Sequence, residues 1–390
     1  MGDSLIVEEA YRRMNALTYG GMIVTVTATL PRPITEYQAQ SAEELFRRTV
    51  AAKHTLGQRV MILGHNYQRD EAIQHADFRG DSLLLAKLAA ERSERSHIVF
   101  CGVHFMAETA DILSRSQQTV ILPDMAAGCS MADMAAIEQV DQCWEALGRV
   151  IPVEETVMPA VYVNSAAVLK AFCGEHGGIT CTSSNAKAVI EWSWARREKI
   201  LFFPDEHLGR NTANKMGIPR EQMIVWDPYQ PNGGNTKDAI KRATLILWKG
   251  HCSVHQMFQP VHVDHFRKQY PDGKVIVHPE CHEDVVNKAD LIGSTEFIIR
   301  TVTAAPAGTT WAVGTELNLV NRLKHELTDK KVFFLSSTVC QCATMFRIDA
   351  AHLCWAMENL AEGHVVNRIV VPDDDKHWAK VALDRMMAIS

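Results

Sequence analysis

Residues 119–133 read TVILPDMAAGCSMAD, a short apolar run followed by a turn and then a cysteine. The same order of features returns in ATLILWKGHCSVHQMF at residues 243–258 and in KVFFLSSTVCQCATMF at residues 331–346. A weak self-similarity at a spacing of roughly 90 to 120 residues is typical of repeated supersecondary units. The sequence therefore predicts three copies of one small unit, each with a strand that runs into a cysteine.

Short runs rich in valine and isoleucine alternate with stretches of helical period along the chain. Such runs are typical of parallel strands in a sheet that helices cover on both faces, so we expect an α/β protein of three-layer αβα units. Strands are expected at residues 59–65, 97–102, 119–124, 160–164, 179–184, 199–205, 223–228, 274–279, 291–295, 310–315 and 331–337. Helices are expected at residues 81–93, 106–114, 165–172, 185–198, 281–290, 295–305 and 315–327. Loops are expected at residues 77–82 and 230–238.

The predicted units divide the chain into four parts. Residues 1–44 form a lead-in, and the units span residues 45–150, 151–265 and 266–390, the last with a C-terminal helical tail. Ligands of open α/β sheets bind beyond the carboxyl ends of the strands. We therefore expect three homologous units with parallel sheets around a pseudo-threefold axis, with the active site at the centre.

The composition excludes several classes of partner. The 390 residues carry a formal net charge of −6, with 47% hydrophobic and 22% charged residues. This balance gives no electrostatic reason to expect nucleic acid or an anionic membrane as a partner. The first residues lack the pattern of a secretory signal, and no apolar run reaches the roughly 20 residues that span a membrane. We therefore expect a cytoplasmic protein.

The ten cysteines do not suggest a disulfide framework, which belongs to short secreted domains. The repeated positions Cys129, Cys252 and one of Cys340 or Cys342 would instead meet at the common axis and hold an iron–sulfur cluster. Three protein thiolates leave one iron open to a substrate oxygen, as a Lewis acid requires. A zinc site that includes Cys281 is the alternative, although the C-x-C spacing of the close pair is tighter than in most zinc sites.

Polar side chains stand at the ends of the predicted strands, where a folded core would not select them. Each one alone is explained by a helix cap or a turn, but their density predicts a site for a small, multiply anionic substrate. Dinucleotide, P-loop, zinc-protease and serine-hydrolase signatures are absent from the sequence. The polar positions are His65, Asn66, Tyr67, Asp81, Ser82, Tyr162, Asn164, Ser183, Ser184, Asn185, His278, Glu280 and Thr295.

A longer series of motifs runs from about residue 45 to the end of the chain. In order, the motifs are GHNY, GDSL, FMAETADIL, AGCSMAD, YVNSAA, CTSSNA, PDEHLGRN, KGHCSVHQMF, VHPEC, IGST, CQCATMFRID and NRIVVPDDDKHWAKVALDRM. This series resembles the quinolinate synthase family. The resemblance implies a [4Fe-4S] transferase of de novo NAD biosynthesis. Its members condense iminoaspartate with dihydroxyacetone phosphate to quinolinate, with loss of phosphate and water. Whether an aspartate oxidase that supplies iminoaspartate docks transiently stays open.

The resemblance implies three cluster ligands. Cys129 in AGCS and Cys252 in GHCSVH match the first two. The third ligand of the family stands in a C-x-x-M context, which selects Cys342 over Cys340. Cys281 follows the substrate-facing HPE and is interpreted as a non-ligand. The other cysteines are expected to be buried or surface thiols: Cys101, Cys143, Cys173, Cys181 and Cys354.

The residue types suggest roles for the polar groups. Tyr67 and Glu280 are the candidates for acid–base catalysis, and His65 and His278 are expected to position the substrate or relay protons. His207 and Arg210 either support the residues that contact substrate or hold a loop, and both alternatives stay open. Phosphate binding also stays open for Arg210. Substrate binding is expected at His65, Ser82, Tyr162, Val163, Asn164, Ser183, His255, His278, Pro279, Glu280 and Thr295.

Three other functions compete with this interpretation. Another cluster-dependent hydro-lyase would share the cysteines but not the whole series of motifs. An iron–sulfur sensor would carry a recognition element such as a basic helix, and none is visible in the sequence. The third alternative is a zinc-stabilised α/β binding protein. Metal analysis would distinguish it, because it would contain zinc in place of iron and sulfide. The sequence leaves the oligomeric state open.

Overall fold

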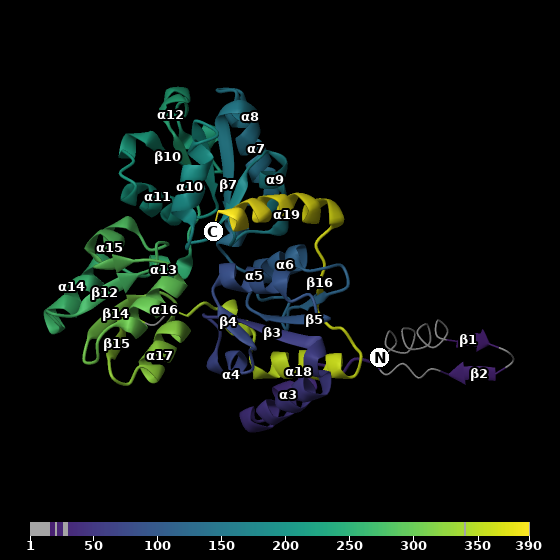
Figure 1. The fold of residues 1–390 in the computed structure, drawn as a ribbon. Helices are drawn as coiled ribbons and strands as arrows, with labels where there is room; N and C mark the ends of the chain where they lie inside the picture. Colours follow the sequence, from purple (N-terminus) through teal and green to yellow (C-terminus); the bar gives the residue numbers. More distant parts are fainter. Residues whose placement is uncertain (1–15, 20–21, 26–29, 339–340, 390) are drawn as a thin grey trace.

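The computed structural model describes residues 16–19, 22–25, 30–338 and 341–389. Three mostly parallel sheets with helices around them form the body of the chain, which confirms the predicted α/β class with three αβα units (Figure 1). A separate antiparallel pair is formed by β1 (Ala16–Tyr19) and β2 (Met22–Thr25). The pseudo-threefold axis and the domain limits stay predictions.

Each of the three sheets draws its strands from one part of the chain, apart from β16. The first has the order β16-β6-β5-β3-β4, with β3 (Val60–His65), β4 (Phe78–Gly80), β5 (His97–Cys101), β6 (Thr119–Ile121) and β16 (Arg368–Ile369). The second has the order β10-β11-β9-β7-β8, with β7 (Val157–Tyr162), β8 (Ile179–Cys181), β9 (Lys199–Phe203), β10 (Met223–Trp226) and β11 (Leu245–Trp248). The third has the order β13-β12-β14-β15, with β12 (Lys274–Val277), β13 (Leu291–Ile292), β14 (Thr310–Gly314) and β15 (Lys331–Phe334).

Helices connect and cover these strands, and none in the described ranges is long and apolar enough to cross a membrane. The α-helices are α2 (Thr35–Gln38), α3 (Ala42–Leu56), α4 (Asp70–Ile73), α5 (Ser82–Glu91), α6 (His104–Leu113), α7 (Ile137–Gly148), α8 (Val153–Thr156), α9 (Ala167–Glu175), α10 (Ala186–Trp194), α11 (Glu206–Lys215), α12 (Lys237–Arg242), α13 (Ser253–Gln256), α14 (Pro260–Gln269), α15 (Glu283–Lys288), α16 (Thr295–Ala304), α17 (Leu317–Glu326), α18 (Ala350–Ala361) and α19 (Asp373–Ala388). Short 3-10 turns lie at Gly57–Arg59, Ala132–Met134, Arg220–Gln222, Pro231–Gly234 and Met345–Arg347.

Two strands of the three sheets differ from the sequence-based expectation, as does the β1–β2 pair, which was not predicted within the lead-in. Residues 77–82 were expected to be a loop, and this prediction was wrong because Phe78–Gly80 form β4, which pairs in parallel with the end of β3. β16 was not predicted and pairs antiparallel with β6. Both strands are two or three residues long and contain an arginine, so neither shows the apolar run that marks the other strands.

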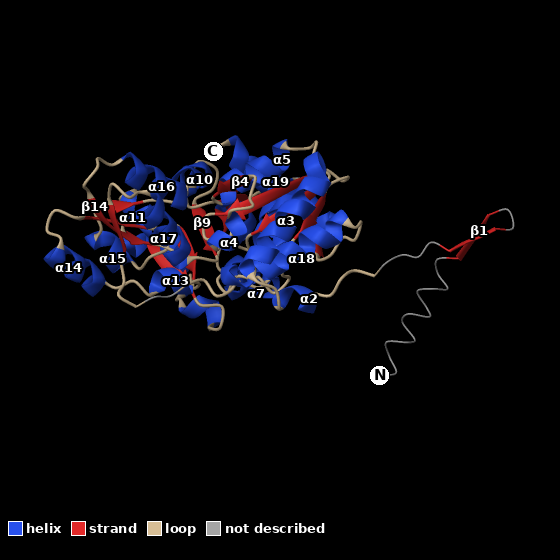
Figure 2. Cartoon of the chain, turned by 90° about the horizontal axis from the view of Figure 1, so that it is seen from below, coloured by secondary structure: helices blue, strands red, loops and turns tan. Residues whose placement is uncertain are grey.

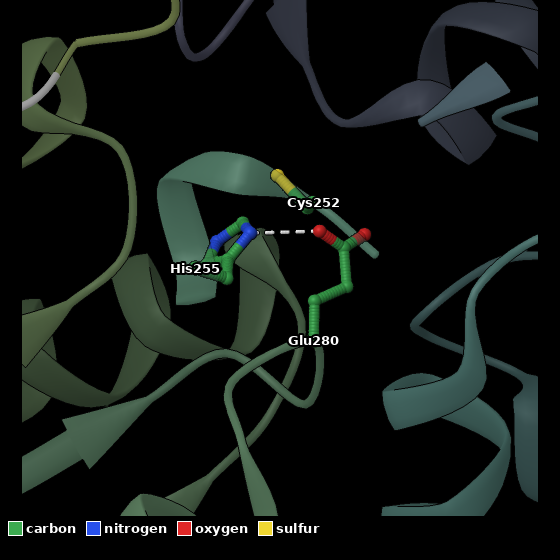
Figure 3. A group of neighbouring side chains, drawn as sticks. All are labelled: Cys252, His255 and Glu280. Carbon is green, nitrogen blue, oxygen red and sulfur yellow. Dashed lines mark ion pairs between the residues drawn. The ribbon is translucent and has the colours of Figure 1, made fainter. Parts of the chain in front are cut away.

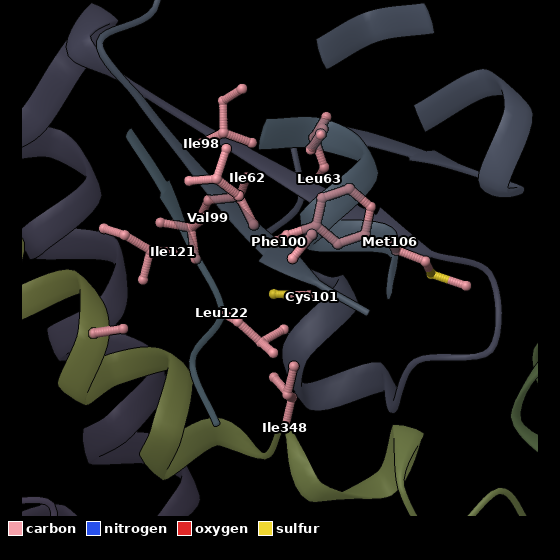
Figure 4. Packing of buried hydrophobic residues seen from close by; sticks show 14 of the residues in the cluster. Ile62, Leu63, Ile98, Val99, Phe100, Cys101, Met106, Ile121, Leu122 and Ile348 are labelled. Carbon is pink, nitrogen blue, oxygen red and sulfur yellow. The ribbon is translucent and has the colours of Figure 1, made fainter. Parts of the chain in front are cut away.

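The core of the first sheet explains its valine- and isoleucine-rich strands. All six residues of β3 are buried, since helices cover both faces of the sheet. Ile62, Val99 and Phe100 pack there together with Ile348 from the segment that follows β15 (Figure 4). Full burial of one such side chain contributes about 1.5–3 kcal/mol. The segment after the third sheet is therefore anchored by apolar burial in the first sheet.

The end of the chain returns to the first two sheets. α18 packs against α3, and α19 packs against α9 and contacts α6 (Figure 1). The carboxylate of Asp111 in α6 accepts a hydrogen bond from the Val371 amide at 3.0 Å and from Lys376 at 3.1 Å. Viewed from below, the helices of the third sheet lie at one end of the body and α3 and α18 towards the other (Figure 2). The C-terminal residues thus join the first sheet to the second.

Candidate active site

A cavity lies where strand ends from the three sheets meet. His65 ends β3 in the first sheet, Tyr162 ends β7 in the second, and His278 follows β12 in the third. All three side chains line the cavity. Twelve of the residues singled out by sequence line it: His65, Tyr67, Asp81, Ser82, Tyr162, Val163, Asn164, Ser183, His255, His278, Glu280 and Thr295.

Three cysteines line the same cavity. Cys129 follows β6, Cys252 follows β11 and Cys342 follows β15, so each of the three sheets supplies one thiol. Each of the three residues is partly buried. Cys340, the alternative third ligand, lies outside the described residues.

The chemistry of this donor set fits an iron–sulfur cluster. Burial raises the pKa of the Cys129 thiol to about 12 and raises that of Cys252 well above its ordinary value. The described lining residues include no lysine or arginine that could neutralise thiolates. Because thiolates are the ligands that iron binds, positively charged iron would offset the cost of ionising these buried groups.

The remaining described cysteines lie outside the cavity. Cys281 is fully buried beneath the third sheet, and its Sγ lies 3.7 Å from the carbonyl oxygen of Gly314. Its neighbour Glu280 faces the cavity instead. The other five are buried in the hydrophobic cores: Cys101, Cys143, Cys173, Cys181 and Cys354.

Glu280 is the centre of a buried hydrogen-bonded group. The hydroxyl of Tyr162 donates to its Oε1 at 2.6 Å, and Nδ1 of His255 lies 2.7 Å from its Oε2 (Figure 3). His278 stacks on His255 with a centroid distance of 4.6 Å. Burial alone would raise the pKa of Glu280, but the two histidines and the hydrogen bonds hold it below its ordinary value. Glu280 is therefore a carboxylate at neutral pH.

Two histidines of the cavity stay neutral. Burial lowers the pKa of His278 to about 3 and that of His65 to about 3. A neutral imidazole carries one donor and one acceptor nitrogen. Nδ1 of His65 accepts from the Tyr67 amide at 3.2 Å, and Nδ1 of His278 accepts from the Glu280 amide at 3.3 Å. Nε2 of each ring therefore carries the proton and can donate to a substrate group at neutral pH.

Tyr67 is held by two threonines of the third sheet. Its hydroxyl lies 2.6 Å from Oγ1 of Thr315 and accepts from Oγ1 of Thr295 at 3.1 Å. Thr315 also lies 3.1 Å from Nε2 of His255. Burial, with the nearby charge of Glu280, raises the pKa of Tyr67 well above its ordinary value. The phenol stays protonated, at one end of a chain of contacts that runs through Thr315 and His255 to Glu280.

One part of the site would also suit a single metal ion. Ligand atoms of Cys252, His255 and Glu280 lie within 4.8 Å of one another. A thiolate, an imidazole and a carboxylate are all ligands that zinc accepts. This geometry therefore does not distinguish zinc from iron, and metal analysis is the measurement that does.

Two helices begin at the cavity and a third begins close to it. α5 begins at Ser82 and α16 at Thr295, and both residues line the cavity, whereas α10 begins at Ala186, three residues after the lining residue Ser183. Backbone N–H groups at a helix N-terminus attract anions. Ser184 donates to Asp81, the N-cap of α5, at 3.0 Å and so links two of these helix starts. The cavity therefore offers neutral donors and partial positive charge to an anionic ligand, although two acidic side chains, Asp81 and Glu280, also line it.

Several predicted residues do not line the cavity. Pro279 was expected to bind substrate, but only its neighbours His278 and Glu280 face the cavity. The Pro279 carbonyl accepts from Asn211 of α11 at 2.8 Å. Arg210 is buried in an ion pair with Glu206, which favours the structural role for it over phosphate binding. The cavity wall also lacks four other predicted residues, Asn66, Ser184, Asn185 and His207.

Other residues of the site were missed by sequence analysis. Thr315 does not line the cavity but contacts Tyr67 and His255, which do, and it follows β14 directly, so the rule that polar residues follow the strands could have found it. Thr182 stands one residue before Ser183 and follows the same rule. The apolar part of the wall carries no such signal in the sequence, and its residues are Leu83, Val103, Phe105, Met106, Met131 and Met345.

Sequence comparisons with known proteins identify the family of this chain. A profile of the family described as Quinolinate synthetase A protein matches residues 48–388. Quinolinate synthase of Rhodopirellula baltica is 55% identical over 368 residues, which cover 92% of this chain and 94% of the relative. Quinolinate synthase of Acidobacterium capsulatum is 57% identical over 344 residues, with 88% of this chain and 92% of the relative covered. The chain therefore belongs to the quinolinate synthase family, described as Quinolinate synthetase A protein.

Proposed function

We propose that this enzyme condenses iminoaspartate with dihydroxyacetone phosphate to quinolinate, with loss of phosphate and water, as a transferase of de novo NAD biosynthesis. The observation that carries the proposal is the meeting of three cysteines, one from each sheet, with a network of polar groups in one cavity. Cys129, Cys252 and Cys342 would hold a [4Fe-4S] cluster. Its iron without a protein ligand would supply a Lewis acid for a substrate oxygen.

Substrate binding in this proposal relies on neutral donors. Iminoaspartate and quinolinate each carry two carboxylates and dihydroxyacetone phosphate carries one phosphate, while the described lining residues include no lysine or arginine. The starts of α5 and α16 would supply backbone N–H groups together with the hydroxyls of Ser82 and Thr295, and Ser183 would add a hydroxyl from the turn before α10. Binding through helix termini leaves no buried cation behind when phosphate departs.

Proton transfer is assigned to the groups whose protonation state the cavity fixes. Tyr67 is a protonated phenol and would donate to a leaving or developing oxygen. Glu280 is a carboxylate, held by Tyr162 and His255, and would accept a proton from the carbon or nitrogen of an intermediate. His65 and His278, both neutral, would orient substrate carbonyl and carboxylate groups.

The test is anaerobic purification with iron, sulfide and zinc analysis, followed by incubation with the two substrates and detection of quinolinate by chromatography. Cys129→Ala, Cys252→Ala and Cys342→Ala should each lose iron and product formation. Cys281→Ala is the matched control and should keep both, because its thiol faces a core and not the cavity. Zinc in place of iron and sulfide, or iron retained by Cys342→Ala, would overturn the ligand assignment. A loaded enzyme that forms no quinolinate would favour another hydro-lyase reaction.

A cytoplasmic location and a transient contact with an aspartate oxidase stay predictions. The domain limits at residues 45–150, 151–265 and 266–390 are likewise a proposal. The return of α18 and α19 to the first two sheets bears on that proposal, since the third segment then contributes structure to all three units.

A further inference from the structure

The loop that carries Tyr67 is held by α17 from the third sheet. Nη1 of Arg322 donates to the Asn66 carbonyl at 2.9 Å, and its Nη2 donates to the Gln68 carbonyl at 2.6 Å. Asn318, one helical turn earlier, donates from Nδ2 to the carbonyl of Tyr67 itself at 3.1 Å. Three consecutive carbonyls of a loop from the first sheet thus accept hydrogen bonds from one helix of the third.

Arg322 is placed so that its contacts are strong. Its residue exposure is only 8%, so its hydrogen bonds are shielded from water. Its Nε also donates to Oδ1 of Asp70 at 2.9 Å, which gives the buried cation a carboxylate partner. Hydrogen bonds from a charged donor are stronger than those between neutral groups. The guanidinium therefore fixes the backbone on both sides of Tyr67.

The side-chain hydroxyl of Tyr67 also contacts residues of the third unit. Its hydroxyl contacts Thr295 at the start of α16 and Thr315 directly before α17. The backbone and the hydroxyl of one residue are therefore both located by the third sheet, although Tyr67 belongs to the first. A shift of the loop would move the hydroxyl away from the two threonines.

We propose that Arg322 is a positioning residue that sets the place of the Tyr67 hydroxyl in the cavity by holding the carbonyls of Asn66 and Gln68. The inference deepens the proposed function, because it rests on Tyr67 as the proton donor. Arg322 itself does not line the cavity.

Two further observations support this role. The planar guanidinium reaches two carbonyls and a carboxylate at once, whereas a lysine ammonium on its flexible stem is a single point charge. The positive charge of Arg322 also acts with burial to lower the pKa of His65, the residue before Asn66. Arg322 thus contributes to the position of one neighbour in the cavity and to the neutrality of another.

A residue that merely joins two units would behave differently, and the chain offers a matched example. Arg220 pairs with Glu283 at 2.6 Å and joins the segment before β10 to α15, away from the cavity. Loss of either arginine removes an ion pair between elements of two sheets. Only loss of Arg322 should affect Tyr67.

The test is a double-mutant cycle on turnover, with iron content measured for every variant. Arg322→Met should lower kcat about 100-fold with the iron content retained, since a displacement of about 1 Å at a reacting group costs that much. Arg322→Lys should be intermediate, and Arg220→Met should match the wild type. The double variant Arg322→Met/Tyr67→Phe should be no slower than Tyr67→Phe, because both changes remove the same group from action. Losses that multiply in the double variant would overturn the proposal.

A second measurement needs no turnover. Hydrogen exchange of the peptide covering residues 60–75 should be faster in Arg322→Met than in the wild type, and unchanged in Arg220→Met. If the wild type forms no quinolinate, the proposed function fails, yet faster exchange at this loop would still support Arg322 as the residue that holds it. Unchanged exchange would overturn the positioning role. Should Arg322→Met not fold, Arg322→Lys and Asn318→Ala give the same comparison with smaller changes.

Discussion

Removal of the Tyr67 hydroxyl is the most direct test of the proposed chemistry. In Tyr67→Phe the ring keeps its place, while the contacts of its hydroxyl with Thr315 and Thr295 are lost. The phenol is the protonated group at the end of the contact chain, so its loss should stop proton donation while the cysteines keep their positions. We therefore expect a large loss of turnover with an unchanged metal content.

The structure separates the expected effect on rate from the effect on stability. Two neutral hydrogen bonds are worth about 0.5–1.5 kcal/mol each, and Thr315 keeps its contact with His255. The variant should therefore lose about 1–3 kcal/mol of unfolding free energy and remain folded. General acid catalysis contributes about 10²–10⁴-fold in rate, or about 3–5 kcal/mol of activation free energy. The loss of kcat should thus exceed what a looser fold would explain.

The assay measures quinolinate formation under anaerobic conditions at saturating substrate, beside iron and sulfide counts. Tyr229→Phe is the matched control, since Tyr229 is 80% exposed and lies outside the cavity. The control should retain wild-type turnover. If Tyr67→Phe kept its cluster and turned over within about threefold of the wild type, Tyr67 could not be the general acid.

Two further predictions concern buried charges. Lys170 is fully buried, and burial lowers its pKa from 10.5 to about 8, so the unfolded chain binds more protons between these pH values. Over that range the unfolding free energy of the wild type should rise by about 3 kcal/mol relative to Lys170→Met, measured by urea denaturation at several pH values; parallel curves would contradict it. Asp124 accepts from Nε of Arg347 at 2.8 Å and joins the loop before Cys129 to the segment after Cys342. Asp124→Asn should release iron to a chelator several-fold faster than wild type, and equal rates would show that the pair does not hold the ligand loops.

The strands and their order within the chain could be predicted because a parallel strand buried on both faces must be continuously apolar. All six residues of β3 are buried, and the pattern is visible in the sequence. β4 and β16 were not predicted because they are short and contain Arg79 and Arg368. Each forms a strand because it pairs with a neighbouring strand, and its own composition does not indicate one. The packing of α18 and α19 on distant helices was not predicted either, because the sequence of an amphipathic helix does not specify the helix that it packs against.

More of the residues that line the cavity than of the packing around it could be predicted from the sequence. His65, Tyr162 and Glu280 were predicted from their places at or after the ends of apolar strands, where a polar residue is easily recognised in the sequence, and all three line the cavity. The positioning groups could not be found this way. Arg322 lies within a helix of ordinary amphipathic pattern, and its function depends on the carbonyls that tertiary structure brings beside it.

The third unit is joined to the first at two places that the proposed reaction needs. Arg322 holds the loop of Tyr67, and on the other side Ile348, which follows Cys342, is buried in the core of the first sheet. Arg69, next to the Tyr67 loop, donates to the Phe346 carbonyl at 3.2 Å and lies over the Phe346 ring. The proposed acid and the proposed third thiolate are therefore located by one interface. A change that shifts the two whole units apart would remove both together, whereas loss of Arg322 alone leaves the contacts of Ile348 and Phe346 in place and should therefore keep the cluster.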